Sequence, residues 1–168
     1  MDAVDDVDVD ESVTYVGKGE TLRFADESEF EDWLLDNGSD AEVTTWYSLV
    51  EERSGAESSG LVSLPDDHPD VLAYLTALEE KQSDDLRLFG GLWDNHTCTG
   101  NVMHVMSVPA NLSWGKRNRA SCVKSAGVVR VLCDRKWWKG RKVVIGISIT
   151  LDLDILDFNN RTDSTFGI

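Results

Sequence analysis

Basic side chains interleaved with tryptophan are the residues of this 168-residue sequence best suited to a chemical role. They gather in two clusters, residues 116–119 and residues 135–142. Cations attract anions, and an indole ring adds stacking or cation–π contact. The clusters therefore favour an anionic partner: a polysaccharide, a membrane surface, a nucleic acid or an acidic protein. A solvated basic face without a partner is the alternative. The candidate binding residues are Lys116, Arg117, Arg119, Arg135, Lys136, Trp137, Lys139, Arg141 and Lys142.

Motifs that would indicate an enzyme are missing from the sequence. There is no serine nucleophile elbow, no glycine-rich phosphate loop and no helix pattern bearing paired carboxylates. The histidines His68, His96 and His104 are too scattered for a zinc site. We therefore expect no catalytic residues and a non-enzymatic protein, and we find no dedicated nucleic-acid-binding motif.

Charge divides the chain into two halves. Residues 1–85 carry 25 acidic and 4 basic side chains, a balance of −21, whereas residues 86–168 carry 6 acidic and 12 basic ones, a balance of +6. Such asymmetry is typical of two separate units, and we place their boundary in the polar run 81–85. Either the acidic half is simply solvated, or it contacts the basic half within the same chain and shields a binding face.

Three features of the sequence bear on whether the protein is secreted or cytoplasmic. The acidic start of the chain lacks the basic and apolar segments of a secretory signal, so we expect no signal peptide in this chain: either the protein stays in the cell, or a signal has been removed. Four of the seven asparagines begin Asn-x-Ser/Thr sequons, namely Asn37, Asn95, Asn111 and Asn160, where chance predicts about one. These sequons favour secretion over the cytoplasm, although an odd number of cysteines points the other way.

The acidic half is expected to be a small α+β unit over residues 13–85, preceded by a disordered acidic tail at residues 1–12. A capping box, Asp26 to Glu29, predicts a helix that ends at Asn37-Gly38. Pro69 predicts the first turn of a second helix, with an apolar face of Leu72, Leu75 and Leu78. The other expected elements are a hairpin of 13–16 with 21–24, a strand over 43–50 and a polar loop over 53–60.

The basic half has the alternation of strands rather than a helical period. Short β-type runs occur at 86–89, 102–108, 128–132 and 143–151, separated by glycines and polar turns. An internal repeat is also present: residues 93–100 align with 133–140, and residues 117–122 align with 159–164. Two units of about 40 residues, each with four short strands, favour an all-β sandwich of two Greek keys.

The repeated spacing of two large residues and a glycine resembles the Greek key of the βγ-crystallin superfamily. The resemblance covers residues 86–168 and implies a non-enzymatic all-β Greek-key sandwich. It places Gly100 and Gly140 in equivalent folded hairpins. It also implies that a serine pins each hairpin: Ser121 in the first repeat, and Asp163 or Ser164 in the second.

Calcium is the cofactor that this resemblance implies, because family members build paired calcium sites from loops that resemble residues 159–164. Side-chain amides, carboxylates and hydroxyls are suitable calcium ligands. In the loop 117–122 the guanidinium of Arg117 opposes a divalent ion, so we expect that site to be lost and the other to be weak or degenerate. The candidate ligands are Asn159, Asn160, Asp163 and Ser164, with Ser121 from the first repeat.

The resemblance also brings Cys98, in the first hairpin, close to Cys122, which follows the serine of that hairpin. A disulfide would close a loop of about 25 residues and stabilise the fold by about 3 kcal/mol; two buried thiols are the alternative. Cys133 would stay unpaired. Trp138 is expected to pack within the second hairpin, which leaves Trp137 as the candidate for an exposed ring.

Two functions fit these observations. The first is a crystallin-like binding module with a weak calcium site. The second is a secreted effector, because the resemblance extends to small peptidase inhibitors and to killer toxins. Under that interpretation the acidic half is a pro-region that shields a basic active domain, although no dibasic pair near residues 80–90 marks a processing site.

Overall fold

The structure of the chain is a computed structural model, and the statements below concern the part of the chain that it describes. This part comprises residues 11–17, 19–80, 91–93, 97–99, 102–105, 110–111, 121–125, 129–147, 149–156, 158, 162 and 164–166. The expected run 86–89, the hairpin glycine Gly100 and the acidic tail up to residue 10 lie outside it.

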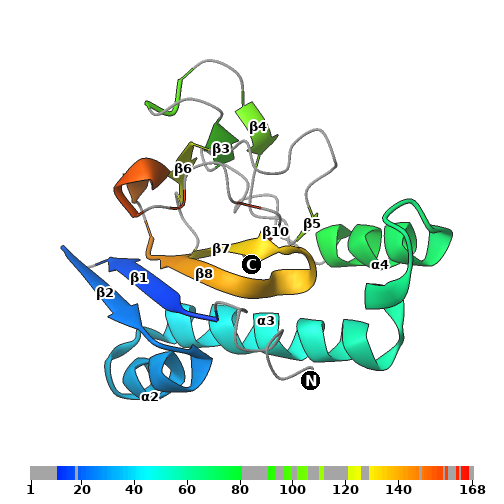
Figure 1. The fold of residues 1–168 in the computed structure, drawn as a ribbon, viewed down its shortest axis with the longest axis horizontal. Helices are drawn as coiled ribbons and strands as arrows, with labels where there is room; N and C mark the ends of the chain where they lie inside the picture. The colour runs from blue at the N-terminus through cyan, green and yellow to red at the C-terminus, as the bar shows by residue number, and fades with distance from the viewer. Residues whose placement is uncertain are drawn as a thin grey trace, which may run out of the picture.

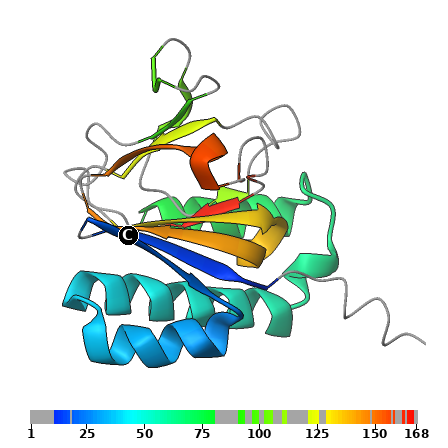
Figure 2. The same ribbon diagram turned by 60° about the vertical axis from the view of Figure 1, so that its left-hand side comes forward.

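The architecture is a mixed α+β arrangement in three layers (Figures 1 and 2). A six-stranded sheet lies in the middle, with helices on one face and a four-stranded sheet on the other. The helices are α2 (Glu27–Asn37), α3 (Asp40–Ser58) and α4 (Pro69–Glu80). The strands are β1 (Val13–Gly17), β2 (Glu20–Phe24), β3 (Gly91–Trp93), β4 (Val102–Val105), β5 (Ala110–Asn111), β6 (Cys122–Lys124), β7 (Arg130–Arg135), β8 (Lys139–Ile145), β9 (Thr150–Asp152) and β10 (Ser164–Phe166).

The strand order exchanges one strand between the two repeats of the basic half. The six-stranded sheet has the order β2-β1-β8-β7-β10-β5, and the four-stranded sheet has the order β4-β3-β6-β9. Thus β5, from the first repeat, lies in the sheet of the second repeat. In return β9, from the second repeat, pairs with β6 of the first. The two repeats are therefore interlocked.

The predicted hairpin of the acidic half is confirmed, and it belongs to the same central sheet. Strands β1 and β2 pair antiparallel, with Val13 opposite Phe24. On its other side β1 pairs with β8 in parallel, with Val13 opposite Lys142. The acidic half therefore contributes two strands to a sheet whose other members come from the basic half.

Helix α2 begins and ends where the sequence predicts. The Asp26 carboxylate accepts a hydrogen bond from the Glu29 amide at 2.9 Å, which satisfies an amide that has no partner in the first turn. Phe30 and Leu34 are buried on one face. The Gly38 amide donates to the Leu34 carbonyl at 2.7 Å and closes the last turn.

The strand predicted over 43–50 is wrong, and so is most of the polar loop predicted over 53–60, because residues 43–50 and 53–58 belong to α3 and only residues 59–60 form a turn. β-branched and aromatic residues over 43–47 suggested a strand. A capping box overrides this preference: the Ser39 hydroxyl accepts from the Glu42 amide, while the Glu42 carboxylate accepts from the Ser39 amide. Trp46, Leu49 and Ala56 are then buried on the face directed at the sheet.

Helix α4 forms as predicted, but its buried face is different. Leu72 is 52% exposed, whereas Val71 is buried. The rotation of the helix is set by Tyr74, whose hydroxyl donates to the Glu52 carboxylate at 2.7 Å. The prediction for Leu72 is therefore wrong; Leu75 is partly buried, and the side chain of Leu78 lies outside the described part.

Side chains alternate along the central strands and build two cores. Val131, Cys133 and Val144 face the helical layer and pack with Trp46 and Leu49. Neighbouring side chains on the same strands face the four-stranded sheet. The core between the sheets comprises Leu92, Val123, Leu132, Val143, Ile145, Leu153, Leu156 and Phe158.

Candidate functional site

The hairpin between β7 and β8 is held by a serine from a third strand. The Ser164 hydroxyl, in β10, donates to the Arg135 carbonyl at 2.6 Å and accepts from the Trp138 amide at 3.1 Å. Ser164 is fully buried; the hydrogen bond from the Trp138 amide is buried as well, whereas the one to the Arg135 carbonyl is partly buried. Of the two candidates for pinning this hairpin, Asp163 lies outside the described residues and Ser164 makes the contacts.

Gly140 is required by the backbone of this hairpin. Its φ is +78°, a conformation that side chains disfavour. A Cβ atom at this position would lie 2.0 Å from the Asp134 carboxylate oxygen. That same oxygen accepts from the Arg141 amide at 2.9 Å, so it cannot move away without losing a hydrogen bond.

The helical layer covers the two tryptophans of the hairpin. Trp138 is fully buried, and its indole nitrogen donates to the Thr165 carbonyl at 2.9 Å. The expectation of an exposed ring at Trp137 is wrong, because this side chain is only 3% exposed. Its ring centre lies 5.9 Å from that of Tyr74 in α4. Trp137 is therefore part of the core and not a surface for stacking.

The lysines of the segment 135–142 pair with acidic residues of the first half. Lys136 lies 2.7 Å from Asp66, and Lys139 lies 3.3 Å from Glu57. Both of these pairs are partly exposed. Arg135 is exposed, while the Arg141 guanidinium lies 4.9 Å from the centre of the Phe158 ring. The other predicted binding residues, Lys116, Arg117 and Arg119, lie outside the described part of the chain.

Lys142 belongs to a buried charge cluster that sequence reasoning missed. Its ammonium group is fully buried, lies 2.6 Å from the Glu27 carboxylate and donates to the Gly140 carbonyl at 2.8 Å. Arg53 binds the same carboxylate through two hydrogen bonds of 2.7 and 2.9 Å, and also donates to the Trp138 carbonyl at 3.0 Å. The cluster, defined as Glu27, Arg53 and Lys142, therefore ties α2 and α3 to the hairpin. The sequence offers one clue to this cluster, because Arg53 is one of only four cationic side chains in the strongly acidic residues 1–85.

Electrostatics within the cluster favour the charged forms of Glu27 and Arg53. Burial alone would raise the pKa of Glu27, but the hydrogen bonds from Arg53 and the charge of Lys142 outweigh it, so the pKa lies below its ordinary value. For Arg53, burial lowers the pKa, but the hydrogen bonds to Glu27 outweigh it and raise the pKa above its ordinary value. Either cation left alone would be a buried charge without a counter-ion, which is costly.

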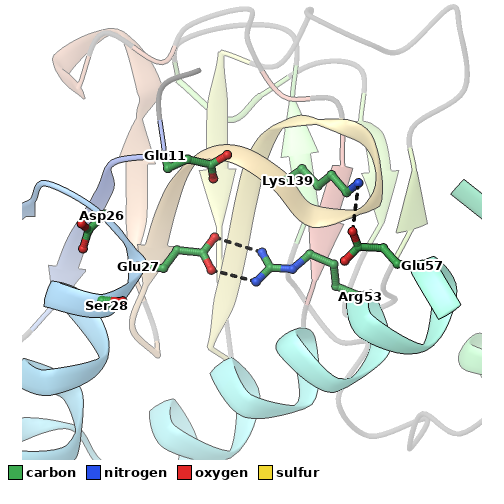
Figure 3. A pocket seen from close by; sticks show the side chains of 7 residues that line it. All are labelled: Glu11, Asp26, Glu27, Ser28, Arg53, Glu57 and Lys139. Atoms are coloured by element: carbon green, nitrogen blue, oxygen red, sulfur yellow. Dashed lines mark hydrogen bonds and ion pairs between the residues drawn. The ribbon is translucent and has the colours of Figure 1, made fainter. Parts of the chain in front are cut away.

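An open pocket of about 510 Å³ lies beside this cluster (Figure 3). In Figure 3 two ion pairs line it, Glu27 with Arg53 and Glu57 with Lys139, and the Glu11 side chain lies above Glu27 in this view. The Glu57–Lys139 pair is the more exposed of the two and therefore the easier one to separate, so a charged group of a ligand could replace either Glu57 or Lys139. The pocket is lined by Glu11, Asp26, Glu27, Ser28, Arg53, Glu57 and Lys139.

Cys98 and Cys122 lie at disulfide distance, with their sulfur atoms 2.05 Å apart. Both are buried, and they pack with Trp93 in a small core of their own. Cys133 is a free thiol within the described residues and is fully buried. Burial raises the pKa of the Cys133 thiol to about 11, which makes it a poor nucleophile.

The predicted calcium ligands are only partly described. Asn159, Asn160 and Asp163 lie outside the described residues, and the hydroxyl of Ser164 serves the hairpin. Ser121 is buried, with its amide donating to the Trp93 carbonyl at 2.8 Å. Across the described residues, no group of three or more acidic, histidine or cysteine side chains is placed to hold a metal ion.

The strand register shows which residue of the first repeat is equivalent to Ser164. In the strand pairing, Ser164 lies opposite Cys133, and Cys122 lies opposite Trp93. Because Trp93 and Cys133 begin the two aligned segments, the equivalent of Ser164 is Cys122. The register therefore makes Cys122 the positional equivalent of Ser164, and the role expected of Ser121 in the first hairpin stays a prediction.

Comparison of the chain with protein-family models, curated proteins and solved structures gave no significant match. Within the described part of the chain, no helix is long and apolar enough to cross a membrane.

Proposed function

We propose that residues 86–168 are a βγ-crystallin-like pair of Greek keys that serves as a non-enzymatic binding module. The observation that carries this proposal is the exchange of β5 and β9 between the two sheets. The first repeat places β3, β4 and β6 side by side in the four-stranded sheet and β5 in the six-stranded sheet. The second repeat places β7, β8 and β10 side by side in the six-stranded sheet and β9 in the four-stranded sheet. This interlocking follows from the fold that the sequence resembles and is improbable for two independent hairpin units.

Backbone geometry supports the repeat. Cys98 has a φ of 55° and Trp138 has a φ of 60°, although neither is a glycine. They lie 40 residues apart, at aligned positions of the two segments. Positive φ is uncommon for such residues, so its presence at both aligned positions supports two hairpins of one type.

The binding face of the module is assigned to the first basic cluster. Lys136, Lys139 and Lys142 are already paired with acidic residues of the same chain. An anionic partner such as a polysaccharide, a membrane surface or an acidic protein would therefore contact Lys116, Arg117 and Arg119. Calcium is proposed to bind weakly in the loop 159–164.

The proposal is tested with the full chain on an immobilised sulfated polysaccharide. We expect K116A/R119A to lose retention at physiological salt, because two of the cations that meet the polymer are removed. The matched variant K136A/K139A removes the same charge from paired positions and should be retained like the wild type. Equal retention of the two variants, or none by the wild type, would refute the assigned face.

Secretion is part of the proposal. A disulfide between Cys98 and Cys122 needs an oxidising compartment. The odd cysteine, Cys133, ceases to be an objection because it is buried where neither oxidants nor other thiols reach it.

A secreted effector with a shielding acidic half is the second candidate, favoured by the pairing of Lys136, Lys139 and Lys142 with Asp66, Glu57 and Glu27. Separately produced residues 1–85 and 86–168 would then associate at low salt and part as salt rises. Association that persists in high salt would instead favour a permanent helical layer, because an apolar core resists screening.

A further inference from the structure

The sequon Asn37-Gly38-Ser39 lies at the surface turn between α2 and α3. Asn37 is the last residue of α2, and Gly38 and Ser39 form the extended link that precedes α3, with φ of −75° and −73°. Asn37 and Ser39 are both exposed. The link belongs to the helical layer, whose other face packs on the central sheet (Figure 2). The acceptor asparagine is therefore presented to solvent and not to either core.

The local hydrogen bonds tolerate a modified Asn37. Its side-chain nitrogen donates to the Trp33 carbonyl at 3.1 Å. An asparagine amide has two N–H groups, and a substituent on the nitrogen leaves one of them. That remaining N–H can keep the bond to Trp33. Ser39 caps α3 by accepting from the Glu42 amide at 3.2 Å, and this cap does not involve the nitrogen of Asn37.

Two independent features place the chain where asparagine is glycosylated. Cys98 and Cys122 lie at disulfide distance, and the sequence has four sequons among seven asparagines. Of the other three sequon asparagines, Asn111 lies within β5, whereas Asn95 and Asn160 lie outside the described residues. Asn37 is therefore the sequon that the described structure shows to be open to a large substituent.

We propose that Asn37 is an acceptor site for an N-linked oligosaccharide, an inference that rests on the proposed secretion of the chain. The donor class is an oligosaccharide joined to a polyprenyl diphosphate. The Asn37 amide nitrogen forms a bond to the anomeric carbon of the first sugar, and the bond from that carbon to the diphosphate oxygen breaks. The lipid diphosphate leaves with the bonding electrons, and the amide proton passes to a base of the transferase.

The experiment expresses the full chain behind a cleavable signal in a eukaryotic secretory host and maps glycans by peptide mass spectrometry. Medium and cell lysate are both analysed, because the sugar is attached before export. We expect a glycan on the peptide that contains Asn37, released by an amidase that converts the asparagine to aspartate. N37Q should lose it while keeping the Ser39 cap.

S39T is the matched control, because threonine retains both the sequon and the capping hydroxyl, and its Asn37 should stay modified. S39A should lose the glycan. An unmodified Asn37 peptide in wild-type protein, from either fraction, overturns the inference. Failure of the proposed secretion is distinguishable, since it would appear as protein that carries the glycan in the lysate but is absent from the medium.

Discussion

Cys122 and Ser164 occupy the same position in the two repeats and fix their hairpins by different chemistry. Ser164 holds the second hairpin through hydrogen bonds to the backbone of Arg135 and Trp138. Cys122 lies at disulfide distance from Cys98, which aligns with Trp138. A covalent bond in one repeat therefore stands where a hydroxyl stands in the other, and the two can be tested separately.

Ser164→Ala should destabilise the protein by about 1–3 kcal/mol, because the buried Trp138 amide and the partly buried Arg135 carbonyl would lose their partner. Urea unfolding monitored by tryptophan fluorescence measures the change. Thr150→Ala, at an exposed position of β9, is the control and should stay within about 0.5 kcal/mol of the wild type. Equal stability of S164A and the wild type would contradict the role of the hydroxyl.

C98A/C122A should be less stable than the wild type by about 3 kcal/mol, because the unfolded chain gains the freedom of an open loop. Unfolding is measured with and without a reductant. The wild type should weaken in reductant, whereas the double variant should not respond, since Cys133 has no disulfide to lose. A wild type that ignores reductant after unfolding and refolding in it would argue against the bond.

Gly140→Ala and Gly55→Ala should change stability in opposite directions. At Gly140 the new Cβ would meet the Asp134 carboxylate, and the positive φ adds strain of about 1–2 kcal/mol. Gly55 lies within α3 with no atom in range of a Cβ, so alanine should stabilise the helix by about 0.5–1 kcal/mol. Thermal unfolding of both variants gives the comparison; a tolerated alanine at position 140 would mean that the hairpin has another shape.

Glu27→Gln should destabilise the protein at pH 7 by about 3 kcal/mol or more, because Arg53 and Lys142 lose their shared counter-ion. The folded pKa of Glu27 lies below the ordinary value of 4.5, so its stabilising effect is present above that value and is lost as pH falls through the folded pKa. The difference between wild type and E27Q should therefore shrink in acid.

Denaturant titrations at pH 7, 5 and about 3 measure this convergence. Glu29→Gln, at an exposed position two residues further along α2, is the control and should show only a small change at every pH. A constant gap between wild type and E27Q across the series would contradict the assignment of the acid sensitivity to Glu27.

Calcium binding is expected to be confined to the loop 159–164. Asn160→Ala or Asp163→Ala should abolish any rise of the melting temperature in calcium. Arg117→Ala should leave that rise unchanged or increase it, because a cation near the first loop is removed. Calorimetric titration of the full chain checks the number of sites, and two equal sites would contradict the argument from Arg117.

Short sequence patterns were sufficient to predict those elements whose conformation depends on neighbouring residues. The cap at Asp26, the hairpin around residues 17–20 and the glycine conformation at Gly140 each depend on residues a few positions apart. Helix α3 was misread because residues 43–47 have strand propensity, and the capping box of Ser39 and Glu42 was overlooked; this local cap, together with burial of Trp46, favours the helix.

The candidate site depended on contacts that no local pattern encodes. Glu27, Arg53 and Lys142 meet only after α2, α3 and β8 have packed together. Likewise, Trp137 is buried because α4, which is distant in the sequence, packs against its ring. Sequence reasoning located the basic segment and offered contact with the acidic half as one alternative, but it could not tell which side chains pair.

The parallel pairing of β1 with β8 has a consequence for synthesis at the ribosome. Val13 pairs with Lys142, so β1 cannot complete its pairing until β8, far along the chain, has been synthesised. Contacts of such long separation close slowly. Until then Trp46 and Leu49 have no sheet to cover. The nascent acidic half would thus emerge with its apolar face open, and its many negative charges would keep neighbouring nascent chains apart during that interval.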